Sequence, residues 1–213
     1  MRYRAASDRS LLVSFNPDVS EEISEANRLR VERLTRKLVA ARPQGIVNVH
    51  PAYASVLVVF DPLALDHESV KRLCEATAEV PPAVPRTLEI PVHYGGAYGP
   101  DLVDVARHAK LPPEEVVRIH SGAEYVVHFL GFSPGFPYLG GMAKSIATPR
   151  LASPRVRVPA GSVAIGGGQT GVYPLDSPGG WRLIGWTPRV LFDANADPPA
   201  ILEMGCRVRF RPV

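Results

Sequence analysis

The chain has 213 residues, of which 46% are hydrophobic and 21% are charged, and its formal net charge is +3. These values are ordinary for a globular protein, and a chain of this length buries roughly 70% of its unfolded surface in one large or two small domains. No apolar run reaches the ~18 residues of a membrane span, and the first residues lack the apolar core of a signal peptide, so the sequence predicts a cytoplasmic protein without a membrane segment.

The N-terminal part alternates short apolar runs with helical patterns. Residues 11–15 predict a strand, and Ser20 predicts the start of a helix that ends before Pro43. The β-branched runs within 46–60 predict a hairpin, and Asp66 predicts the start of a second helix. The order strand, helix, strand, strand, helix predicts a small α+β domain related to ferredoxin-like folds.

The first predicted helix carries a run of arginine and lysine residues between positions 28 and 37. Such a run can bind phosphate or nucleic acid, but a helix face exposed to solvent is the simpler interpretation. Cys74 and Cys206 stand far apart, and the six histidines show no metal-ligand spacing, so the sequence predicts no metal site.

Residues 81–86 are rich in proline and predict a stiff linker between a domain at 1–80 and a second domain at 87–213. In the second domain a predicted helix pair, at 101–109 and 112–120, has the spacing of a DNA-reading motif. The second of these helices begins with Pro-Pro-Glu-Glu, whose acids would repel phosphates, so no nucleic-acid partner is predicted. The many short strands and glycine- or proline-rich turns that follow predict a barrel or sandwich.

A glycine block at residues 166–171 satisfies Gly-x-Gly-x-x-Gly but is not followed by a helix, so it does not predict a dinucleotide site. No Walker A lysine follows it either. One interpretation is a loop in which the amides of Gly167 and Gly168, with Gln169 and Thr170, face a small polar ligand. The alternative is a glycine-rich corner of a barrel.

Further candidate residues flank this block. Ser177 and Gly179 lie around a Pro-Gly turn that orients Trp181, and Ser177 is predicted as a hydrogen-bond donor because no base can be assigned to it. Trp181 can equally be a core residue. The aromatic residues of Phe132-Ser-Pro-Gly-Phe136 and Tyr138 could form the floor of a pocket, or pack under a turn.

Ionisable residues complete the set of candidates. His128 lies in an apolar strand, where a neutral imidazole could act as an acid or base, although a core histidine is the commoner case. Arg150, Arg155, Arg157 and Arg182 are candidate partners for an anionic substrate, because guanidinium groups bind carboxylates and phosphates through two hydrogen bonds.

The blocks at residues 128–141 and 158–193, together with the run at 90–96, resemble the KipI/PxpB family in order and over nearly the whole chain. This resemblance implies a cyclophilin-like β-barrel as the second domain. It also implies the B subunit of a 5-oxoprolinase complex, which acts with a related C subunit and an A subunit. Such a complex hydrolyses 5-oxoproline to L-glutamate with ATP, accompanied by Mg²⁺.

Within that resemblance, His128 or Tyr173 is expected to contact the lactam, while Arg155, Ser177 and the glycine block hold anionic groups. Two other activities occur in the family and stay open: inhibition of a sensor histidine kinase, and a role as a component of urea carboxylase or allophanate hydrolase. One departure is Trp186, which stands where the family pattern has an arginine.

Overall fold

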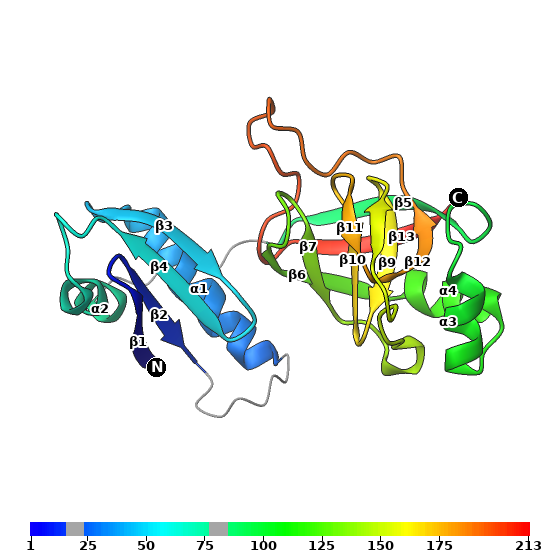
Figure 1. The fold of residues 1–213 in the computed structure, drawn as a ribbon, viewed down its shortest axis with the longest axis horizontal. Coiled ribbons are helices and arrows are strands. Elements are labelled where there is room, and N and C mark those ends of the chain that lie inside the picture. Colours follow the sequence, from blue (N-terminus) through cyan, green and yellow to red (C-terminus); the bar gives the residue numbers. More distant parts are fainter. Residues whose placement is uncertain (16–23, 77–84) are drawn as a thin grey trace. The chain divides into compact units, whose positions relative to one another are not determined.

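A computed structural model describes residues 1–15, 24–76 and 85–213, and the chain divides into two compact units, residues 1–84 and 85–213 (Figure 1). The predicted linker at 81–86 lies mostly outside the described residues, so its boundaries stay a prediction.

The N-terminal unit is an antiparallel sheet of four strands with two helices. The strand order is β1-β2-β4-β3, and α1 packs against β3 and β4 while α2 packs against β2. The elements are β1 (Arg2–Ser7), β2 (Ser10–Ser14), α1 (Glu25–Ala41), β3 (Ile46–Pro51), β4 (Ser55–Phe60) and α2 (His67–Ala76). Alternate residues of β4, Val56, Val58 and Phe60, are buried, which is the period-two pattern of a strand with one face on the core.

The structure changes two expectations for this unit. Strand β1 was not predicted, because most of its side chains are exposed and an edge strand of this kind has no apolar alternation. The described element order is therefore ββαββα, and the predicted ferredoxin-like arrangement is not confirmed. The predicted helix start at Ser20 lies outside the described residues; α1 is capped by Ser24, whose hydroxyl accepts from the Asn27 N–H at 3.2 Å.

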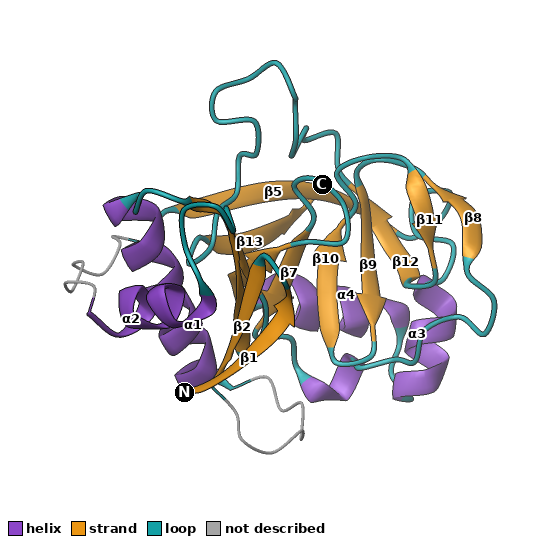
Figure 2. Ribbon diagram, turned by 60° about the vertical axis from the view of Figure 1, so that its left-hand side comes forward, coloured by secondary structure: helices purple, strands orange, loops and turns teal. Residues whose placement is uncertain are grey.

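The second unit contains a closed seven-stranded barrel, which confirms the predicted α+β class and the barrel (Figures 1 and 2). The finer cyclophilin-like assignment stays a prediction. The strand order is β10-β7-β6-β13-β5-β12-β9, and only β13 and β5 pair in parallel among the described barrel strands. The barrel strands are β5 (Thr87–Tyr94), β6 (Glu124–Leu130), β7 (Pro137–Gly140), β9 (Ser162–Gly166), β10 (Gln169–Val172), β12 (Arg182–Trp186) and β13 (Arg207–Pro212).

Shorter elements flank the barrel. The predicted helix pair is present as α3 (Leu102–Ala109) and α4 (Pro113–Gly122), which pack on each other. A 3₁₀ turn, η1 (Lys144–Ile146), contacts both helices. A separate two-stranded ribbon pairs β8 (Arg155–Val158) with β11 (Ser177–Gly179).

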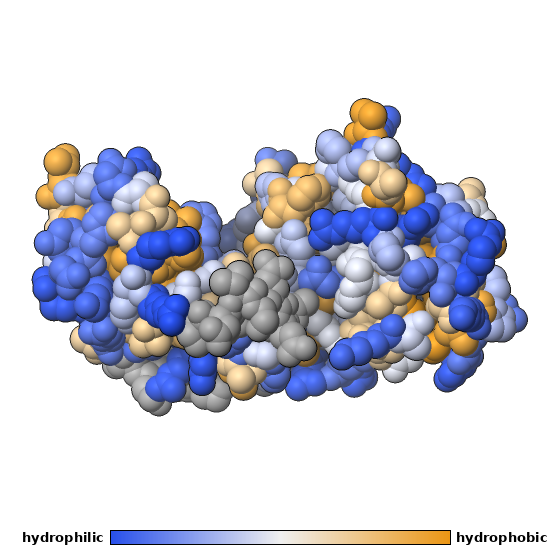
Figure 3. Space-filling model, turned by 60° about the horizontal axis from the view of Figure 1, so that its bottom comes forward, coloured by the Kyte–Doolittle hydropathy of each residue, from blue (hydrophilic) through white to orange (hydrophobic). Residues whose placement is uncertain are grey.

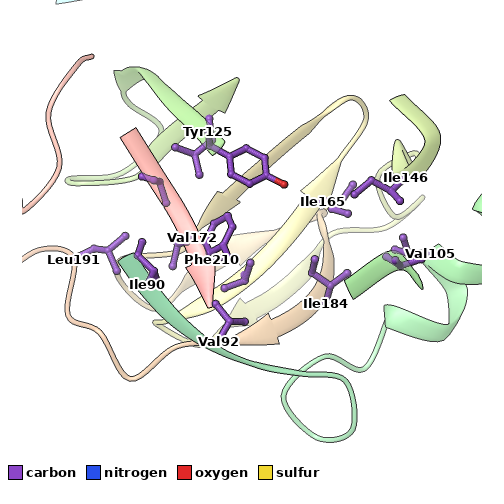
Figure 4. Packing of buried hydrophobic residues seen from close by; sticks show 14 of the residues in the cluster. Ile90, Val92, Val105, Tyr125, Ile146, Ile165, Val172, Ile184, Leu191 and Phe210 are labelled. Carbon is purple, nitrogen blue, oxygen red and sulfur yellow. The ribbon is translucent and has the colours of Figure 1, made fainter. Parts of the chain in front are cut away.

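Branched aliphatic and aromatic side chains fill the barrel. Figure 4 shows side chains from several strands converging on Phe210, while Val105 of α3 and Ile146 of η1 lie beside Ile165 and Ile184. These residues are at most 1% exposed, so the barrel interior is a packed core.

His120 is fully buried in the barrel, and both of its ring nitrogens are hydrogen-bonded. The Thr170 hydroxyl donates to the Ala164 carbonyl at 3.0 Å, so it accepts from His120 Nε2–H at 2.8 Å. His120 Nδ1 is then unprotonated and accepts from the Tyr94 hydroxyl at 2.7 Å. Burial lowers the pKa of His120 to about 3, so the imidazole is neutral.

The outer surface is mixed in character. On the face shown in Figure 3, hydrophilic residues predominate and hydrophobic ones lie between them. Among the described residues, no helix combines the length and apolarity that a membrane crossing requires.

Candidate functional site

A pocket of about 160 Å³ lies in the second unit beside the two-stranded ribbon, and we call it the aromatic pocket. Its walls come from the segment after β6, the segment before β8, and the stretch from β10 to β12. The lining residues are Phe132, Phe136, Tyr138, Arg150, Leu151, Pro154, Tyr173, Gly179, Gly180 and Trp181. Five of these ten are aromatic, so the pocket offers flat apolar surfaces with two hydroxyls and one guanidinium.

Two aromatic rings lie deep in this pocket because glycines allow them to approach. A Cβ on Gly166 would lie 2.5 Å from atoms of the Trp181 ring, and a Cβ on Gly179 would lie 2.4 Å from the Tyr173 hydroxyl. Trp181 and Phe136 meet edge to face at 5.6 Å between ring centroids. Gly166 and Gly179 therefore fix where the two rings lie.

Phe132 lies at the edge of the pocket in a strained turn. Its φ is 66°, and the Ser133 N–H donates to the Gly131 carbonyl at 2.8 Å, which closes a γ-turn around Phe132. A γ-turn with positive φ is rare and strained, and strained residues cluster at functional sites. Phe132 as a residue is 62% exposed, yet its ring contacts the rings of Phe136 and Tyr173. The fold thus holds an exposed aromatic ring over the pocket.

Arg150 supplies positive charge at the pocket. Its guanidinium lies 5.6 Å from the centroid of the Trp181 ring, within the range of a cation–π contact. Because this side chain is exposed and lines the pocket, it can meet a carboxylate without being desolvated first.

Arg155 lies on the ribbon beside the pocket and is held by a buried acid. Its Nη2 donates to Asp101 Oδ1 at 2.8 Å, and the other oxygen of Asp101 accepts from the Leu183 N–H at 2.7 Å. In the ribbon Arg155 pairs with Gly179. A Cβ on Gly179 would point at the Tyr173 hydroxyl. Cross-strand partners point to the same face, so Arg155 points toward Tyr173.

Two polar atoms of this ribbon lack a partner. Arg155 Nη1 and Ser177 Oγ are both buried and have no hydrogen bond to any part of the chain that the structure describes. A buried donor without an acceptor costs about 1–3 kcal/mol, and more when it is charged. Such groups are rare in folded proteins, and their acceptor comes from outside the described chain, as an ordered water, a ligand or a partner.

The pocket hydroxyls are protonated at neutral pH. Burial raises the pKa of Tyr173, although a hydrogen bond from the Trp181 backbone and the charges of Arg150 and Arg155 oppose the increase. Burial also raises the pKa of Tyr138. Neither hydroxyl is therefore suited to act as a base, and the Tyr173 hydroxyl can donate to a ligand oxygen. Together with the arginines they favour a small anion that has a flat or ring-shaped part.

Three of the predicted residues, Tyr173, Gly179 and Trp181, line the pocket together with the aromatic residues around 132–138 that the sequence had offered as a possible pocket floor. Two more, Arg155 and Ser177, lie on the ribbon beside the pocket and are not part of its lining. Asp101 was not singled out by the sequence, because it lies 54 positions from Arg155 and only the folded chain brings the two together.

The glycine block has a different environment from the one expected. Gly167 and Gly168 form the two-residue turn of the β9–β10 hairpin, and Gly167 has φ 64°. The Gly167 N–H donates to the Thr148 carbonyl at 2.8 Å, so this amide is not available to an anion. The geometry is that of the glycine-rich barrel corner, the alternative interpretation of the block.

Three further predicted residues lie outside the lining of the aromatic pocket. Thr170 is fully buried, and its hydroxyl is used by His120 and Ala164, which gives it a structural role instead of the predicted contact with ligand. Gln169 is part of β10 and is half-buried. His128 is 7% exposed and its Nε2 lies 1.9 Å from where a Cβ on Gly140 would be, so it is packed under β7.

Trp186 lies in a stack of aromatic rings from β12, β5 and the segment after β5. Its ring is near-parallel to those of Tyr98, at 5.5 Å, and His93, at 6.2 Å. Its indole N–H donates to the Ala160 carbonyl at 2.8 Å. Of the other candidate arginines, Arg157 pairs with Asp176 and Arg182 donates to the Pro149 carbonyl, so both are used within the chain.

Comparisons with known proteins show to which family the chain belongs. The sequence pattern of the family described as carboxyltransferase domain, subdomain C and D, matches residues 1–202. The chain is 42% identical to the B subunit of 5-oxoprolinase from Bacillus subtilis, over 95% of this chain and 89% of that protein. It is 47% identical to the B subunit of 5-oxoprolinase from Escherichia coli O157:H7, over 92% of this chain and 90% of that one.

The chain belongs to the KipI/PxpB family. Among solved structures, the crystal structure of TTHA0988 superposes with a TM-score of 0.86 and 38% identity, over 96% of this KipI/PxpB chain but only 40% of the TTHA0988 chain. A putative urea carboxylase of Emericella nidulans is 32% identical over 49% of this chain, which is 9% of that much longer protein.

Proposed function

We propose that the chain is the B subunit of an ATP-dependent 5-oxoprolinase complex, a cytoplasmic assembly with A and C subunits that hydrolyses 5-oxoproline to L-glutamate. The two bacterial relatives carry the name of that component. The observation that carries the proposal for this chain is the aromatic pocket, which has a small volume, flat aromatic walls and a guanidinium on its lining.

The chemistry of 5-oxoproline suits this pocket. The molecule is a five-membered lactam with one carboxylate, so it has a flat ring for Trp181 and a negative charge for Arg150. The Tyr173 hydroxyl is a donor for the lactam carbonyl, and Arg155 Nη1 and Ser177 Oγ are donors that lack acceptors within the described chain. Hydrogen-bond donors placed in advance around a carbonyl stabilise the negative charge that develops on it.

ATP does not fit this pocket. Its 160 Å³ is below the roughly 300 Å³ at which pockets for larger ligands begin, and the glycine block offers no phosphate loop. In the proposal ATP and Mg²⁺ therefore bind elsewhere in the complex, and the residues of the aromatic pocket bind and orient only the lactam.

The test is co-expression of this chain with the A and C subunits from the same genome, followed by measurement of ATP hydrolysis with and without 5-oxoproline. We expect 5-oxoproline to stimulate ATP hydrolysis, and the stimulation to vanish when this chain is omitted. A stable complex that 5-oxoproline does not stimulate would contradict the proposal.

A second candidate function is a component of a urea carboxylase, which the relationship to the Emericella nidulans protein favours. That function requires a biotin carboxylase partner. It predicts that urea, and not 5-oxoproline, stimulates ATP hydrolysis when such a partner is supplied.

A further inference from the structure

One wall of the aromatic pocket is formed by rigid backbone, and we call Pro154, Gly179 and Gly180 the ribbon wall. A Cβ on Gly180 would lie 3.7 Å from atoms of Pro154, so the two residues are close neighbours. The glycines have no side chain that can rotate, and the proline ring fixes its own backbone. The position of this wall therefore depends on where the backbone of the ribbon is held.

The ribbon has few bonds of its own to hold it in place. Its strands β8 and β11 pair with each other and form a sheet separate from the barrel (Figure 2). The register between Ser177 and Gly179 is irregular, which disturbs the pairing of two already short strands. A two-stranded sheet is only marginally stable alone, so the ribbon needs an anchor on the rest of the unit.

Arg155 of β8 provides such an anchor through Asp101. Arg155 Nη2 donates to Asp101 Oδ1 at 2.8 Å, and among residues 85–213, all of which are described, Asp101 is the one acid that forms an ion pair with Arg155. Asp101 is only 5% exposed. Solvent and salt screen a partly buried ion pair much less than an exposed one, so this pair can hold the ribbon.

Asp101 also joins this anchor to the aromatic side of the pocket. Its Oδ2 accepts from the Leu183 N–H at 2.7 Å, and its own N–H donates to the Leu183 carbonyl at 2.9 Å. Leu183 belongs to the same buried cluster as Phe136, Tyr173 and Trp181, whose rings line the pocket. One acid therefore ties the ribbon wall to the aromatic rings of the same pocket.

The place of Asp101 in its helix shows that the side chain serves this tie. Asp101 is the N-cap residue of α3, where an aspartate commonly accepts from the amides of the first turn. Here the side chain makes no such bond. Its two oxygens accept from Arg155 and Leu183 instead, so the helix cap is given up and the pocket walls are joined.

We propose that Asp101 is a positioning residue that, through Arg155, holds the ribbon wall at the distance a five-membered lactam requires, and so sets the preference for ring size. This inference rests on the proposed function and deepens it, because it concerns the same pocket. A six-membered lactam has one more methylene and needs the wall farther out. One methylene changes the preference of a shaped pocket by about 10–200-fold.

The first measurement is amide hydrogen exchange of the full chain, read by mass spectrometry. Asp101→Asn has one oxygen where two are used, so one of the two bonds is lost. We expect exchange in the ribbon, at 155–158 and 177–180, to become about tenfold faster, while exchange in β5 and β13 stays unchanged. Asp104→Asn is the matched control, because this acid of the same helix pairs with Arg107 at 2.7 Å outside the pocket lining.

The second measurement compares kcat/KM for 5-oxoproline and for its six-membered homologue, 6-oxopiperidine-2-carboxylate, in ATP hydrolysis by the complex. We expect the wild type to prefer 5-oxoproline by about tenfold or more, and Asp101→Asn by about threefold or less. Asp104→Asn should keep the wild-type preference within about twofold. Loss of folded protein lowers both kcat/KM values equally, so a merely structural role of Asp101 would not move their ratio.

A second variant, Asp101→Asn/Arg155→Gln, removes both charges and so leaves no unpaired charge if Asp101→Asn alone does not fold. It should show the same faster exchange and the same lower preference, because glutamine is too short to restore the tie. Unchanged exchange in the ribbon, or an unchanged preference, would overturn the role of Asp101. Failure of either lactam to stimulate the wild-type complex would overturn the proposed function and the ring-size role with it, whereas hydrogen exchange still decides whether Asp101 holds the ribbon.

Discussion

Phe132 holds an exposed ring over the aromatic pocket in a backbone conformation that few non-glycine residues adopt. The substitution Phe132→Asn should leave the melting temperature unchanged or raise it, because asparagine tolerates positive φ. It should also weaken 5-oxoproline binding by the assembled complex about fivefold, since an aromatic contact contributes about 1 kcal/mol. Phe132→Tyr keeps the ring and should bind as the wild type does. Unchanged affinity in Phe132→Asn would show that the ring does not cover the ligand.

Thr170 was predicted to contact ligand, but its hydroxyl joins His120 to the Ala164 carbonyl inside the barrel. Thr170→Val keeps the shape and removes the acceptor for His120 Nε2–H. We expect the free energy of unfolding to fall by about 1–3 kcal/mol, while 5-oxoproline affinity stays near that of the wild type. Chemical denaturation and ligand titration measure the two quantities. The reverse result, a lost affinity without lost stability, would restore the predicted role of Thr170.

His120 also makes stability depend on pH. Its pKa in the folded chain is about 3, below the value near 6.5 expected when the chain is unfolded. Between these values the unfolded chain binds a proton that the folded chain does not, so the free energy of unfolding falls as the pH falls, by about 1.4 kcal/mol per pH unit. The stability is complete above pH ~6.5.

The measurement is denaturant unfolding at several pH values, with His120→Gln as the comparison. The variant loses stability at every pH, but it should lose the part of the slope that His120 contributes between pH 6.5 and 4. Equal slopes in the two proteins would mean that His120 is not held neutral by the fold.

At the scale of elements, the β9–β10 hairpin separates two interpretations of the glycine block. Gly167 has φ 64°, whereas Gly168 faces open space without a positive φ. Gly167→Ala should therefore destabilise the chain by about 1–2 kcal/mol, and Gly168→Ala should have almost no effect. Neither change should alter 5-oxoproline or ATP affinity of the complex. Loss of affinity in both variants, measured by titration, would favour the anion-binding loop over the barrel corner.

Elements with a regular apolar pattern could be predicted, and those without one could not. The helix pair at α3 and α4 was predicted to within a few residues, because apolar residues at helical spacing, such as Leu102, Val105 and Ala106, mark it. Strand β1 was missed because it is stabilised by pairing with β2 along an exposed edge, and backbone pairing leaves no apolar pattern in the sequence. The glycines of the hairpin were recognised, but their sequence alone did not separate a tight turn from a ligand loop.

At the scale of the whole molecule, the candidate site depends on contacts between distant parts of the chain. The aromatic residues around 132–138 and the segment at 177–181 were both identified in the sequence, and the fold brings them into one pocket. The pairing of Arg155 with Asp101 could not be predicted, since neither residue lies in a motif that refers to the other. The sequence therefore indicated the chemistry of each segment, but only the folded barrel shows which residues share a site.

In the proposed function, the aromatic pocket binds 5-oxoproline through Arg150. The most direct measurement is the KM for 5-oxoproline in ATP hydrolysis by the complex, with Arg150→Met compared with Arg157→Met, whose arginine pairs with Asp176 outside the pocket lining. We expect KM to rise about tenfold in Arg150→Met, because a charge-assisted hydrogen bond is lost, and to stay within about twofold in Arg157→Met. Equal KM values in both variants and the wild type would place 5-oxoproline elsewhere.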